Sequence, residues 1–357
     1  MINFFGSKKK YFWKKFKYLR FLLKNINFIS INKKNDSLYY FPTYNKFETA
    51  IQALNSIKND INNIDILIID NGSKDFEEIR KKFETLNFII LNSNVGSTGA
   101  QWVGLYYALK YKYKKIIISD NDSFMITKNG LSKMIEISNS TNNIAISPTN
   151  ITDLFSINEK NYLSSSFHVS QFFLINLEKI NLKNSFNPLM YIACEDTVLS
   201  SKVLTKGKIY KTKDVKYQHP PLKSSNFNSQ SIFLKLRALI MIIFFEKNIN
   251  LKTYLRIIGM FIFSCFDLMI NALRFKDYKS LLLISKSFVS SFKSWGLDDL
   301  INDLNDVNKF KYSLKVSDIK IENAKELKNS NKFFMPRRFK VRNKLSNNFI
   351  YYKLQRD

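Results

Sequence analysis

Short runs of β-branched and aromatic residues alternate with helix-length amphipathic segments between residues 36 and 225. Segments with helical periodicity lie near 46–58, 75–84, 99–110 and 129–139. Strand-length runs separated by helices are typical of an α/β protein with crossover helices. The pattern therefore predicts a single, mostly parallel, Rossmann-like sheet with flanking helices. The strand-length runs are SLYYFP (37–42), IDILIID (64–70), LNFIIL (86–91), KKIIIS (114–119) and NIAIS (143–147).

The pattern changes on both sides of this region and divides the chain into four parts. Residues 1–35 are a basic, amphipathic N-terminal extension, and residues 36–225 carry the α/β domain. Residues 226–300 form an apolar, helical C-terminal extension, and residues 301–357 form a polar, basic tail. A chain of 357 residues with 45% hydrophobic content is long enough for one large domain with extensions.

Two flanking segments have the pattern of surfaces that contact a membrane. Within residues 8–24, apolar side chains recur at helical spacing among Lys and Arg, which is typical of an interfacial helix; they are Phe12, Phe16, Leu19 and Leu23. Residues 231–273 contain two predicted helices, 231–245 and 252–273, which either touch a membrane or pack on the α/β domain. The longest uncharged apolar runs are shorter than the roughly 20 residues of a spanning helix, so we expect no transmembrane segment. No secretory signal pattern is visible either.

The charge of the chain limits the class of partner. The 56 basic and 29 acidic residues give a net charge of +27 and a pI near 9.8. Such a field attracts polyanions, whether nucleic acid, anionic lipid or a sugar nucleotide. The two cysteines, Cys194 and Cys265, exclude a disulfide framework and a cysteine-based zinc site, and they are consistent with a reducing compartment.

Polar, turn-forming residues follow four of the predicted strands. In an open α/β sheet, ligands bind outside the carboxyl ends of the strands, so these positions are where chemistry is expected. Each segment taken alone is also consistent with an ordinary turn or a helix cap. The four segments are Pro42-Thr43-Tyr44-Asn45, Asp70-Asn71-Gly72-Ser73, Asn92-Ser93-Asn94-Val95-Gly96 and Asp120-Asn121-Asp122.

The order of the motifs along the chain resembles that of family 2 glycosyltransferases, which have the GT-A fold of the nucleotide-diphosphosugar transferases. The resemblance covers about residues 37–225 and implies a GT-A catalytic domain. It implies an inverting transfer of a sugar from a UDP- or dTDP-linked donor to a glycan or lipid-linked acceptor, in the synthesis of cell-surface polysaccharide or glycoconjugate. The motifs are FPTYNK, LIIDNGSKD, NSNVGSTGAQWVGLYYAL, IIISDND, CEDTVLSSKVLTKG and YQHP.

The D-x-D motif is the candidate metal site. Loss of a nucleoside diphosphate requires neutralisation of the charge that builds on the phosphates, and hard oxygen ligands suit Mg²⁺ or Mn²⁺. The resemblance implies that Asp122 binds the cation directly, and that Asp120 contacts the donor ribose or a metal-bound water. It also implies that His219 completes the metal shell, although an ordinary loop histidine explains His219 equally well. The two aspartates also fit a helix cap.

The earlier strand ends are the candidate nucleotide pocket. The resemblance implies that Pro42, Thr43 and Tyr44 form a wall of the base pocket, where an aromatic ring stacks on a pyrimidine. Asp70 and Asn71 follow the next strand, where the family often has two aspartates. Because the Asn71 amide donates as well as accepts, we expect its contact with the base to differ from that of a second aspartate. Two glycines, Gly96 and Gly99, allow a close approach to the donor or serve as packing glycines.

The segment CEDTVLSSKVLTKG is the candidate source of the catalytic base. A helix is predicted from 195 to 206, where Asp196 shares a face with Leu199 and Val203 and points toward the body of the domain. The resemblance implies that Asp196 is the general base, with its neighbour Glu195 as the other candidate. The second histidine of the chain, His168, is expected to be structural, with a contact to the donor or the acceptor as the alternative.

Two other classes of function remain open on the sequence. A nucleotidyltransferase of related fold would need a glycine-rich, basic phosphate loop, where this chain has Pro42-Thr43-Tyr44-Asn45. A non-catalytic basic protein that binds a membrane or nucleic acid is supported only by the high lysine content. For the enzyme we expect a cytoplasmic location, peripheral at an anionic membrane surface on the inner face of the cell membrane, and no nucleic-acid partner.

Overall fold

The computed structural model describes most of the chain. His168 and most of the predicted helix 75–84 lie outside the described residues. These residues are 4–74, 77, 80–81, 84–151, 161–164, 172–182, 186–192, 194–219, 227–246, 249, 251–274, 278–293, 297–308, 313–321, 341–342 and 349–355.

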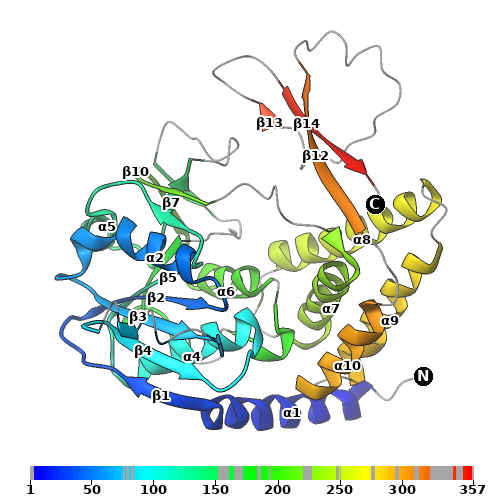
Figure 1. Cartoon of the computed structure of the whole chain (residues 1–357), viewed down its shortest axis with the longest axis horizontal. Helices are drawn as coiled ribbons and strands as arrows, with labels where there is room; N and C mark the ends of the chain where they lie inside the picture. The colour runs from blue at the N-terminus through cyan, green and yellow to red at the C-terminus, as the bar shows by residue number, and fades with distance from the viewer. Residues whose placement is uncertain are drawn as a thin grey trace.

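A ten-stranded sheet forms the centre of the protein, in the order β1-β4-β3-β2-β5-β9-β7-β10-β6, with β8 paired to β10 (Figure 1). The pairings give β2, β3, β4, β5, β7 and β10 one common direction. The predicted α/β fold with a mostly parallel sheet is therefore confirmed. The strands are β1 (Ile26–Ser30), β2 (Ser37–Thr43), β3 (Asp65–Asp70), β4 (Asn87–Leu91), β5 (Lys115–Ser119), β6 (Phe124–Met125), β7 (Ala145–Asn150), β8 (Tyr162–Ser164), β9 (Phe172–Asn176) and β10 (Ile209–Gln218).

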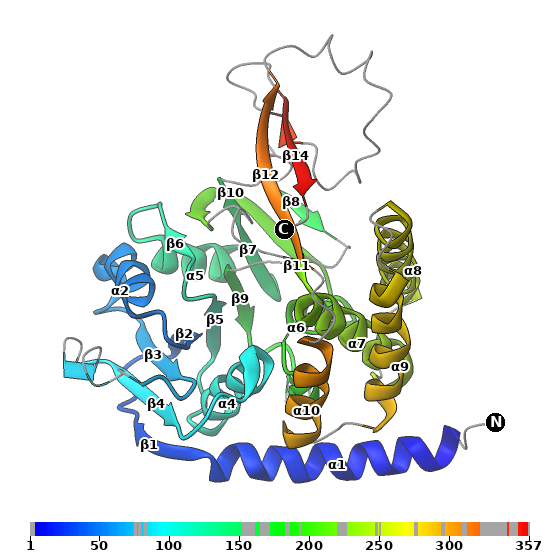
Figure 2. The ribbon, with the colours of Figure 1, turned by 45° about the vertical axis from the view of Figure 1, so that its right-hand side comes forward.

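Helices cover both faces of this sheet, which is why its central strands are apolar throughout. Along β2, Tyr39 and Phe41 face a core cluster shared with α2 (Phe47–Ser56) and α5 (Gly130–Thr141). The intervening Leu38 and Tyr40 face a second cluster, which includes side chains of α4 (Gly96–Lys110) and α6 (Glu195–Leu204). Figure 2 shows α2 and α5 on one side of the sheet and α4 on the other. These four helices lie where the hydrophobic pattern predicts them.

Five strands of the sheet, β1, β6, β8, β9 and β10, are not among the five strand-length runs identified in the sequence. β9 lies between β5 and β7 and runs antiparallel to both. β1 lies at the edge of the sheet and runs antiparallel to β4. An apolar run does not show the direction in which a strand pairs, and β1 has an almost fully exposed pattern. As a result, the predicted N-terminal extension contributes an edge strand to the sheet of the α/β domain.

The N-terminal helix α1 (Phe4–Lys24) packs on the α/β domain through tyrosines. Tyr11 and Tyr18 are buried in the core together with Leu22. Buried tyrosines need a partner for the hydroxyl, and here Tyr18 Oη donates to the Val95 carbonyl at 3.5 Å while Asn187 Nδ2 donates to Tyr11 Oη. The predicted membrane-facing stripe is divided, because Phe12 and Phe16 are exposed while Leu19 and Leu23 pack against the core.

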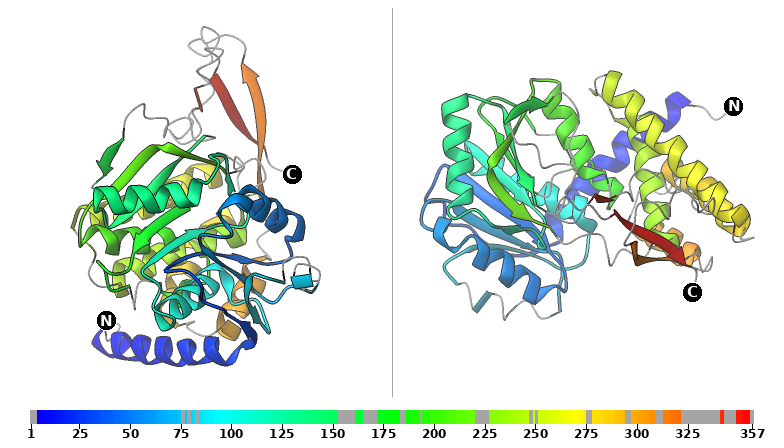
Figure 3. Two further views of the ribbon diagram at one scale, coloured as in Figure 1. Left: turned by 90° about the vertical axis from the view of Figure 1, so that its left-hand side faces the viewer. Right: turned by 90° about the horizontal axis from the view of Figure 1, so that it is seen from above.

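The C-terminal extension is a group of helices that lies beside the sheet (Figure 3). α7 packs on the α/β domain through Leu239 and Ile242, and on the other C-terminal helices through Phe233 and Leu236. For α7, burial of most of its apolar side chains favours domain packing over membrane contact. The helices are α7 (Ser229–Phe245), α8 (Leu251–Arg274), α9 (Leu282–Lys293) and α10 (Leu297–Asn308), with the short 3₁₀ segment η4 (Tyr278–Leu281). Two other 3₁₀ segments, η1 (Lys58–Asp60) and η2 (Pro188–Met190), lie in the α/β domain.

A second, four-stranded antiparallel sheet follows these helices in the order β11-β12-β14-β13. It lies apart from the central sheet in Figures 1 and 2. Residue 301, where the basic tail was expected to begin, lies inside α10, and described residues after this helix contribute three strands to the second sheet. The strands are β11 (Phe227–Asn228), β12 (Ser313–Ile321), β13 (Val341–Arg342) and β14 (Phe349–Gln355).

Helix α8 changes the expectation that no segment is long enough to cross a membrane. Within the part of the chain that the structure describes, residues 253–270 are long and apolar enough by length and composition, and only 24% of this window is buried. The sequence expectation counted uncharged runs only, whereas α8 is continuous and has just two charged residues in the window, Arg256 and Asp267. Length and composition are weak grounds for a span, since core helices also meet them.

Candidate active site

The loops that follow β2, β3 and β5 meet at the carboxyl edge of the sheet. Thr43 pairs with Asp70 in the parallel register of β2 and β3, and the Thr43 carbonyl accepts a hydrogen bond from Asn71 N at 2.8 Å. Across the neighbouring strand, Asn121 Nδ2 donates to Thr43 Oγ1 at 3.3 Å. Three of the four polar segments found in the sequence are thus in direct contact, and the fourth, residues 92–96, is hydrogen-bonded to Asn71.

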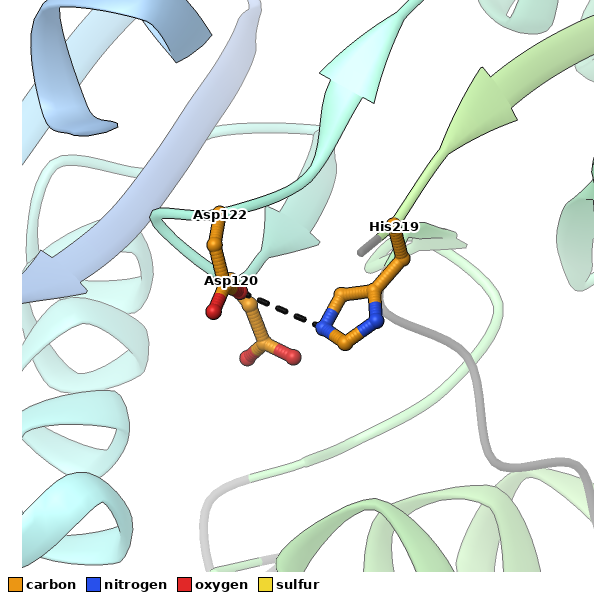
Figure 4. Close-up of side chains that lie close together, drawn as sticks. All are labelled: Asp120, Asp122 and His219. Carbon is orange, nitrogen blue, oxygen red and sulfur yellow. Dashed lines mark ion pairs between the residues drawn. The ribbon is translucent and has the colours of Figure 1, made fainter. Parts of the chain in front are cut away.

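The two-residue strand β6 brings His219 to the D-x-D motif. β6 directly follows the motif and pairs with the end of β10, so that Phe124 lies opposite Gln218. His219 is the next residue after β10, and its Nε2 lies 3.2 Å from Asp122 Oδ1. Figure 4 shows the side chains of Asp120, Asp122 and His219 pointing toward one another, from two chain segments about 100 residues apart in sequence.

These three side chains fit a divalent cation. One ligand atom from each of Asp120, Asp122 and His219 lies within 4.8 Å of the others. Two carboxylates and an imidazole are an acceptable ligand set for Mn²⁺, and the carboxylates suit Mg²⁺. The donor set and its spacing therefore support a metal site formed by the residues that the sequence indicates.

Lys46 is a further charged residue of the site that the sequence reasoning missed. Its Nζ lies 3.2 Å from Asp122 Oδ2, so both oxygens of this carboxylate have a partner. Burial raises the pKa of Asp122, but the hydrogen bond from His219 and the charge of Lys46 outweigh it and lower the pKa to about 2. The sequence did contain a signal for Lys46, because it is the last residue of the FPTYNK motif and directly follows the segment Pro42-Thr43-Tyr44-Asn45.

Glu195 and Asp196 occupy the first turn of α6, where the helix dipole favours negative charge. Glu195 Oε1 accepts a hydrogen bond of 2.9 Å from Ser97 Oγ, in the first turn of α4. Asp196 Oδ1 accepts from the backbone N–H of Thr197 at 2.6 Å. The two neighbouring carboxylates thus have different surroundings, because adjacent residues on a helix point in different directions. Among the hydrogen bonds described, that of Glu195 connects α6 to α4, whereas that of Asp196 stays within α6.

The α6 carboxylates and the D-x-D motif interact electrostatically. Burial and then the negative charges of Asp122 and Glu195 raise the pKa of Asp120 to about 7. Burial and then the charge of Glu195, with a further contribution from Asp120, raise the pKa of Asp196 to about 7. Charges influence one another this strongly only at short range in a partly dry site. The arrangement can therefore bind a cation at one end and accept a proton at the other.

Asp70 and Asn71 organise the loops beneath the site. Asp70 is fully buried, and both of its carboxylate oxygens accept a hydrogen bond from Ser73 N at 3.1 Å. Burial raises the pKa of Asp70 above its usual value. The Asn71 amide donates to Asn94 Oδ1 at 3.0 Å and its Oδ1 accepts from Val95 N at 2.9 Å. An aspartate could not donate in this way, which gives a structural reason for asparagine here.

Gly96 and Gly99 both lie at crowded positions. Gly96 has φ of +78°, and a Cβ there would lie 2.2 Å from the carbonyl oxygen of Tyr191. That carbonyl accepts a hydrogen bond of 3.0 Å from Thr98 N, which joins the start of α4 to the loop that leads into α6. A Cβ on Gly99 would lie 2.9 Å from Val95 Cγ2. Both glycines therefore permit close packing within the protein around the site.

The FPTY segment ends β2 and leads into the turn beside the D-x-D motif. Thr43 is buried and Pro42 is half-buried, whereas Tyr44 is exposed. The next residue, Asn45, has φ of +49° and donates its backbone N–H to Ser73 Oγ at 2.8 Å. An exposed aromatic ring above a rigid turn is suited to stacking on a planar ligand.

Buried polar residues of the flanking helices hold the segment that leads into α6. Arg237 of α7 is almost fully buried and donates to the Leu189 carbonyl in η2 at 2.7 Å and to Ser290 Oγ at 3.1 Å. Burial lowers the pKa of Arg237 to about 10. In the sequence, Arg237 lies within the apolar run SIFLKLRALIMIIFF and is expected at the edge of an apolar surface, whereas the structure buries it.

The comparisons with known proteins agree with this arrangement. Residues 40–203 match the model of the family described as Glycosyl transferase family 2. The chain is similar in structure to S. aureus TarS 1–349 (TM-score 0.51, 13% identity, covering 76% of this chain and 90% of that chain). It is also similar to a longer S. aureus TarS chain (TM-score 0.50, 15% identity, covering 80% of this chain and 57% of that chain). At these identities the likeness shows the fold alone. No curated protein sequence matches the chain.

Proposed function

Residues 40–203 form a glycosyltransferase domain of family 2, and we propose that this domain transfers a sugar from a UDP- or dTDP-linked donor to an acceptor hydroxyl with inversion at the anomeric carbon. The observation that carries this proposal is the convergence of two acidic motifs, Asp120-Asn121-Asp122 after β5 and Glu195-Asp196 at the start of α6. Burial, and after it the charges of the neighbouring carboxylates, raises the pKa values of Asp120 and Asp196. A general base for the acceptor and a cation that neutralises the departing diphosphate both assist an inverting transfer, and this arrangement offers groups for each role.

Asp122 and His219 are the proposed ligands of Mg²⁺ or Mn²⁺, with Asp120 beside them. When bound, such a cation neutralises the negative charge that builds on the departing diphosphate. Asp120 binds the cation or the ribose of the donor. The low pKa of Asp122 keeps its carboxylate ionised, and therefore able to bind a cation, throughout the physiological pH range.

Asp196 is the proposed general base. The acceptor oxygen attacks the anomeric carbon while its proton passes to the Asp196 carboxylate, and the nucleoside diphosphate leaves from the opposite face. A base with a pKa of about 7 is ionised for much of the time at neutral pH and still holds a proton well. Glu195 is the second candidate, but its carboxylate is held by Ser97, which favours a positioning role.

The nucleotide is proposed to bind along the ends of β2 and β3. The exposed ring of Tyr44 stacks on the base, with Pro42 and Thr43 as the adjoining wall. Asp70 and Asn71 support this pocket by fixing the loops around it. Gly96 and Gly99 keep the start of α4 close to the site. Hydrogen bonds of Asp70 and Asn71 and the close contacts at the two glycines support these roles.

The acceptor is proposed to be a glycan or a lipid-linked glycan at the cytoplasmic face of the cell membrane, in the synthesis of cell-surface polysaccharide. The outer face of α1 supports this location, because it presents aromatic rings beside cationic side chains. Lys17 Nζ lies 5.2 Å from the Trp13 ring and the Arg20 guanidinium lies 4.8 Å from the Phe16 ring. Such pairs suit an anionic lipid surface, and the net charge of +27 adds to the attraction.

Thermal stabilisation by a panel of sugar nucleotides, with and without Mn²⁺, tests the proposed function. A ligand at a hundred times its dissociation constant adds about 2.7 kcal/mol of stability, which is a clear shift in Tm. We expect one UDP- or dTDP-sugar to stabilise the wild-type protein in Mn²⁺, and Asp122→Asn to lose most of this shift. If no nucleotide sugar stabilises the protein in either condition, the donor assignment is wrong.

A further inference from the structure

Lys46 contacts the oxygen of Asp122 that His219 leaves free. Lys46 Nζ lies 3.2 Å from Asp122 Oδ2, and His219 Nε2 lies 3.2 Å from Oδ1. We propose that Lys46 is an internal counter-ion which a divalent cation displaces from Asp122, and that the released ammonium then binds the diphosphate of the donor. This inference rests on the proposed function and adds a donor-binding residue that changes partner during binding.

The backbone that carries Lys46 is fixed, so only the side chain needs to move. Asn45 N donates to Ser73 Oγ at 2.8 Å, and Asn45 Oδ1 accepts from Lys74 N at 3.3 Å. Lys46 itself occupies the N-cap position of α2. A lysine has a long flexible stem and a compact charge, which lets it exchange one anionic partner for another without a change in the loop.

The ion pair between Lys46 and Asp122 is weak enough to be displaced. The Lys46 side chain is 54% exposed and that of Asp122 is 25% exposed. Water screens a pair of this kind, so the expected contribution is only about two- to fivefold in an equilibrium constant. A divalent cation carries twice the charge and binds several ligands at once, so it can bind Asp122 more strongly than Lys46 does. The cation and the ammonium then repel each other, and the more weakly bound lysine leaves.

The diphosphate of the donor is the proposed new partner of the released Lys46 ammonium, because the site is rich in negative charge. Four carboxylates converge here, and a diphosphate brings further negative charge into the same space; they are Asp120, Asp122, Glu195 and Asp196. A divalent cation offsets only part of that charge. Lysine binds phosphate as a point charge, so the ammonium of Lys46 is placed to offset more of it once Asp122 has bound the metal.

Two binding measurements on Lys46→Gln test the inference. Free Mn²⁺ is followed by electron paramagnetic resonance during titration of the nucleotide-free protein, and UDP and dTDP binding is followed by calorimetry at saturating Mn²⁺. We expect Mn²⁺ to bind about two- to fivefold more tightly to Lys46→Gln, because its competitor is gone. We expect the nucleoside diphosphate that binds the wild-type protein to bind at least about fivefold more weakly.

Lys58, which is exposed just beyond the end of α2, provides the matched control. Lys58→Gln removes the same charge from the same region and should leave both affinities within about twofold of wild type. Opposite changes in the two affinities for Lys46→Gln alone support the inference. Unchanged or weaker Mn²⁺ binding in Lys46→Gln, or unchanged nucleotide binding, overturns it.

Asp122→Asn separates this inference from the proposed function. If Asp122→Asn loses Mn²⁺ binding while Lys46→Gln matches wild type in both assays, the metal site stands and the role of Lys46 is refuted. If Asp122→Asn binds Mn²⁺ as wild type does, the metal assignment in the proposed function fails, and the exchange proposed for Lys46 fails with it.

Discussion

The carboxylate of Glu246, just after α7, lies 3.3 Å from Lys202 of α6 and 3.7 Å from Lys15 of α1. Glu246 is only 4% exposed, and the two lysines are also largely buried. This buried triad joins the N-terminal helix to the helix that begins with Glu195 and Asp196. The flanking helices are thus part of the support of the candidate active site.

The first prediction concerns this triad. Glu246→Gln removes the negative charge that two largely buried lysines share, so we expect it to lower the free energy of unfolding by about 3 kcal/mol in chemical denaturation. Asp306→Asn provides the control, because Asp306 pairs with Lys286 at the surface and its loss should change stability by less than about 1 kcal/mol. Equal effects of the two substitutions would contradict the structural role of Glu246.

The second prediction concerns the glycine at the start of α4. Gly96→Ala places a methyl group against the Tyr191 carbonyl at a positive φ, so we expect a loss of more than about 2 kcal/mol and a displaced loop before α6. Gly259 in α8 has no atom within 4 Å of a built Cβ, so Gly259→Ala should be neutral or stabilising by up to about 1 kcal/mol. Denaturation of both variants gives the comparison. A fully stable Gly96→Ala protein would refute the close approach to Tyr191.

The third prediction concerns the pH dependence of stability in excess chelator. The pKa of Asp120 is raised to about 7, so the folded protein holds a proton that the unfolded chain releases near pH 4. Stability from this group is therefore present below about pH 4 and is lost as pH rises toward 7. We expect Asp120→Asn to be more stable than wild type at pH 8 by at least about 1 kcal/mol. The difference should shrink at pH 5, and a constant difference across this range would contradict the raised pKa.

The fourth prediction concerns the membrane. If α1 binds lipid through its exposed aromatic face, replacing Trp13 and Phe16 by Ser should move the protein to the soluble fraction, with donor hydrolysis unchanged. High salt and alkaline carbonate should likewise release the wild-type protein, since salt screens its basic residues.

If α8 is inserted in the membrane instead, the same fractionation should leave the wild-type protein in the membrane fraction. Helix α8 exposes Leu251 and Leu273, at 71% and 64%, near its two ends. Wild-type protein that stays in the membrane through salt and carbonate, and is released only by detergent, would favour insertion of α8 over peripheral binding through α1.

The features that could be predicted from sequence are those set by local pattern. The strands β3 and β5 are apolar because helices cover both faces of the sheet, and the D-x-D motif follows β5 where parallel strands direct ligand groups. The direction of β9 was not predictable, because an apolar run reads the same in either direction. The family and the α/β fold were accordingly within reach of sequence reasoning.

The features that escaped prediction depend on contacts between distant segments. The resemblance implies that His219 is a metal ligand, but the sequence does not show that pairing of β6 with β10 brings it to Asp122. The contact between Lys46 and Asp122 was not predicted at all. Arg237 reads as one charge in an apolar helix until its contact with the Leu189 carbonyl is seen. Neither periodicity nor motif spacing encodes such pairings, because they arise from tertiary packing.

The central claim, that Asp196 is the base of an inverting transfer, is tested most directly by Asp196→Asn. Donor binding by calorimetry and a single turnover of transfer are compared with wild type, together with Glu195→Gln, and the anomeric configuration of the wild-type product is determined. The account predicts donor affinity within about threefold of wild type for Asp196→Asn, transfer slower by at least about a hundredfold, and an inverted product. Transfer at the wild-type rate by Asp196→Asn, a greater loss in Glu195→Gln, or a product with retained configuration would contradict it.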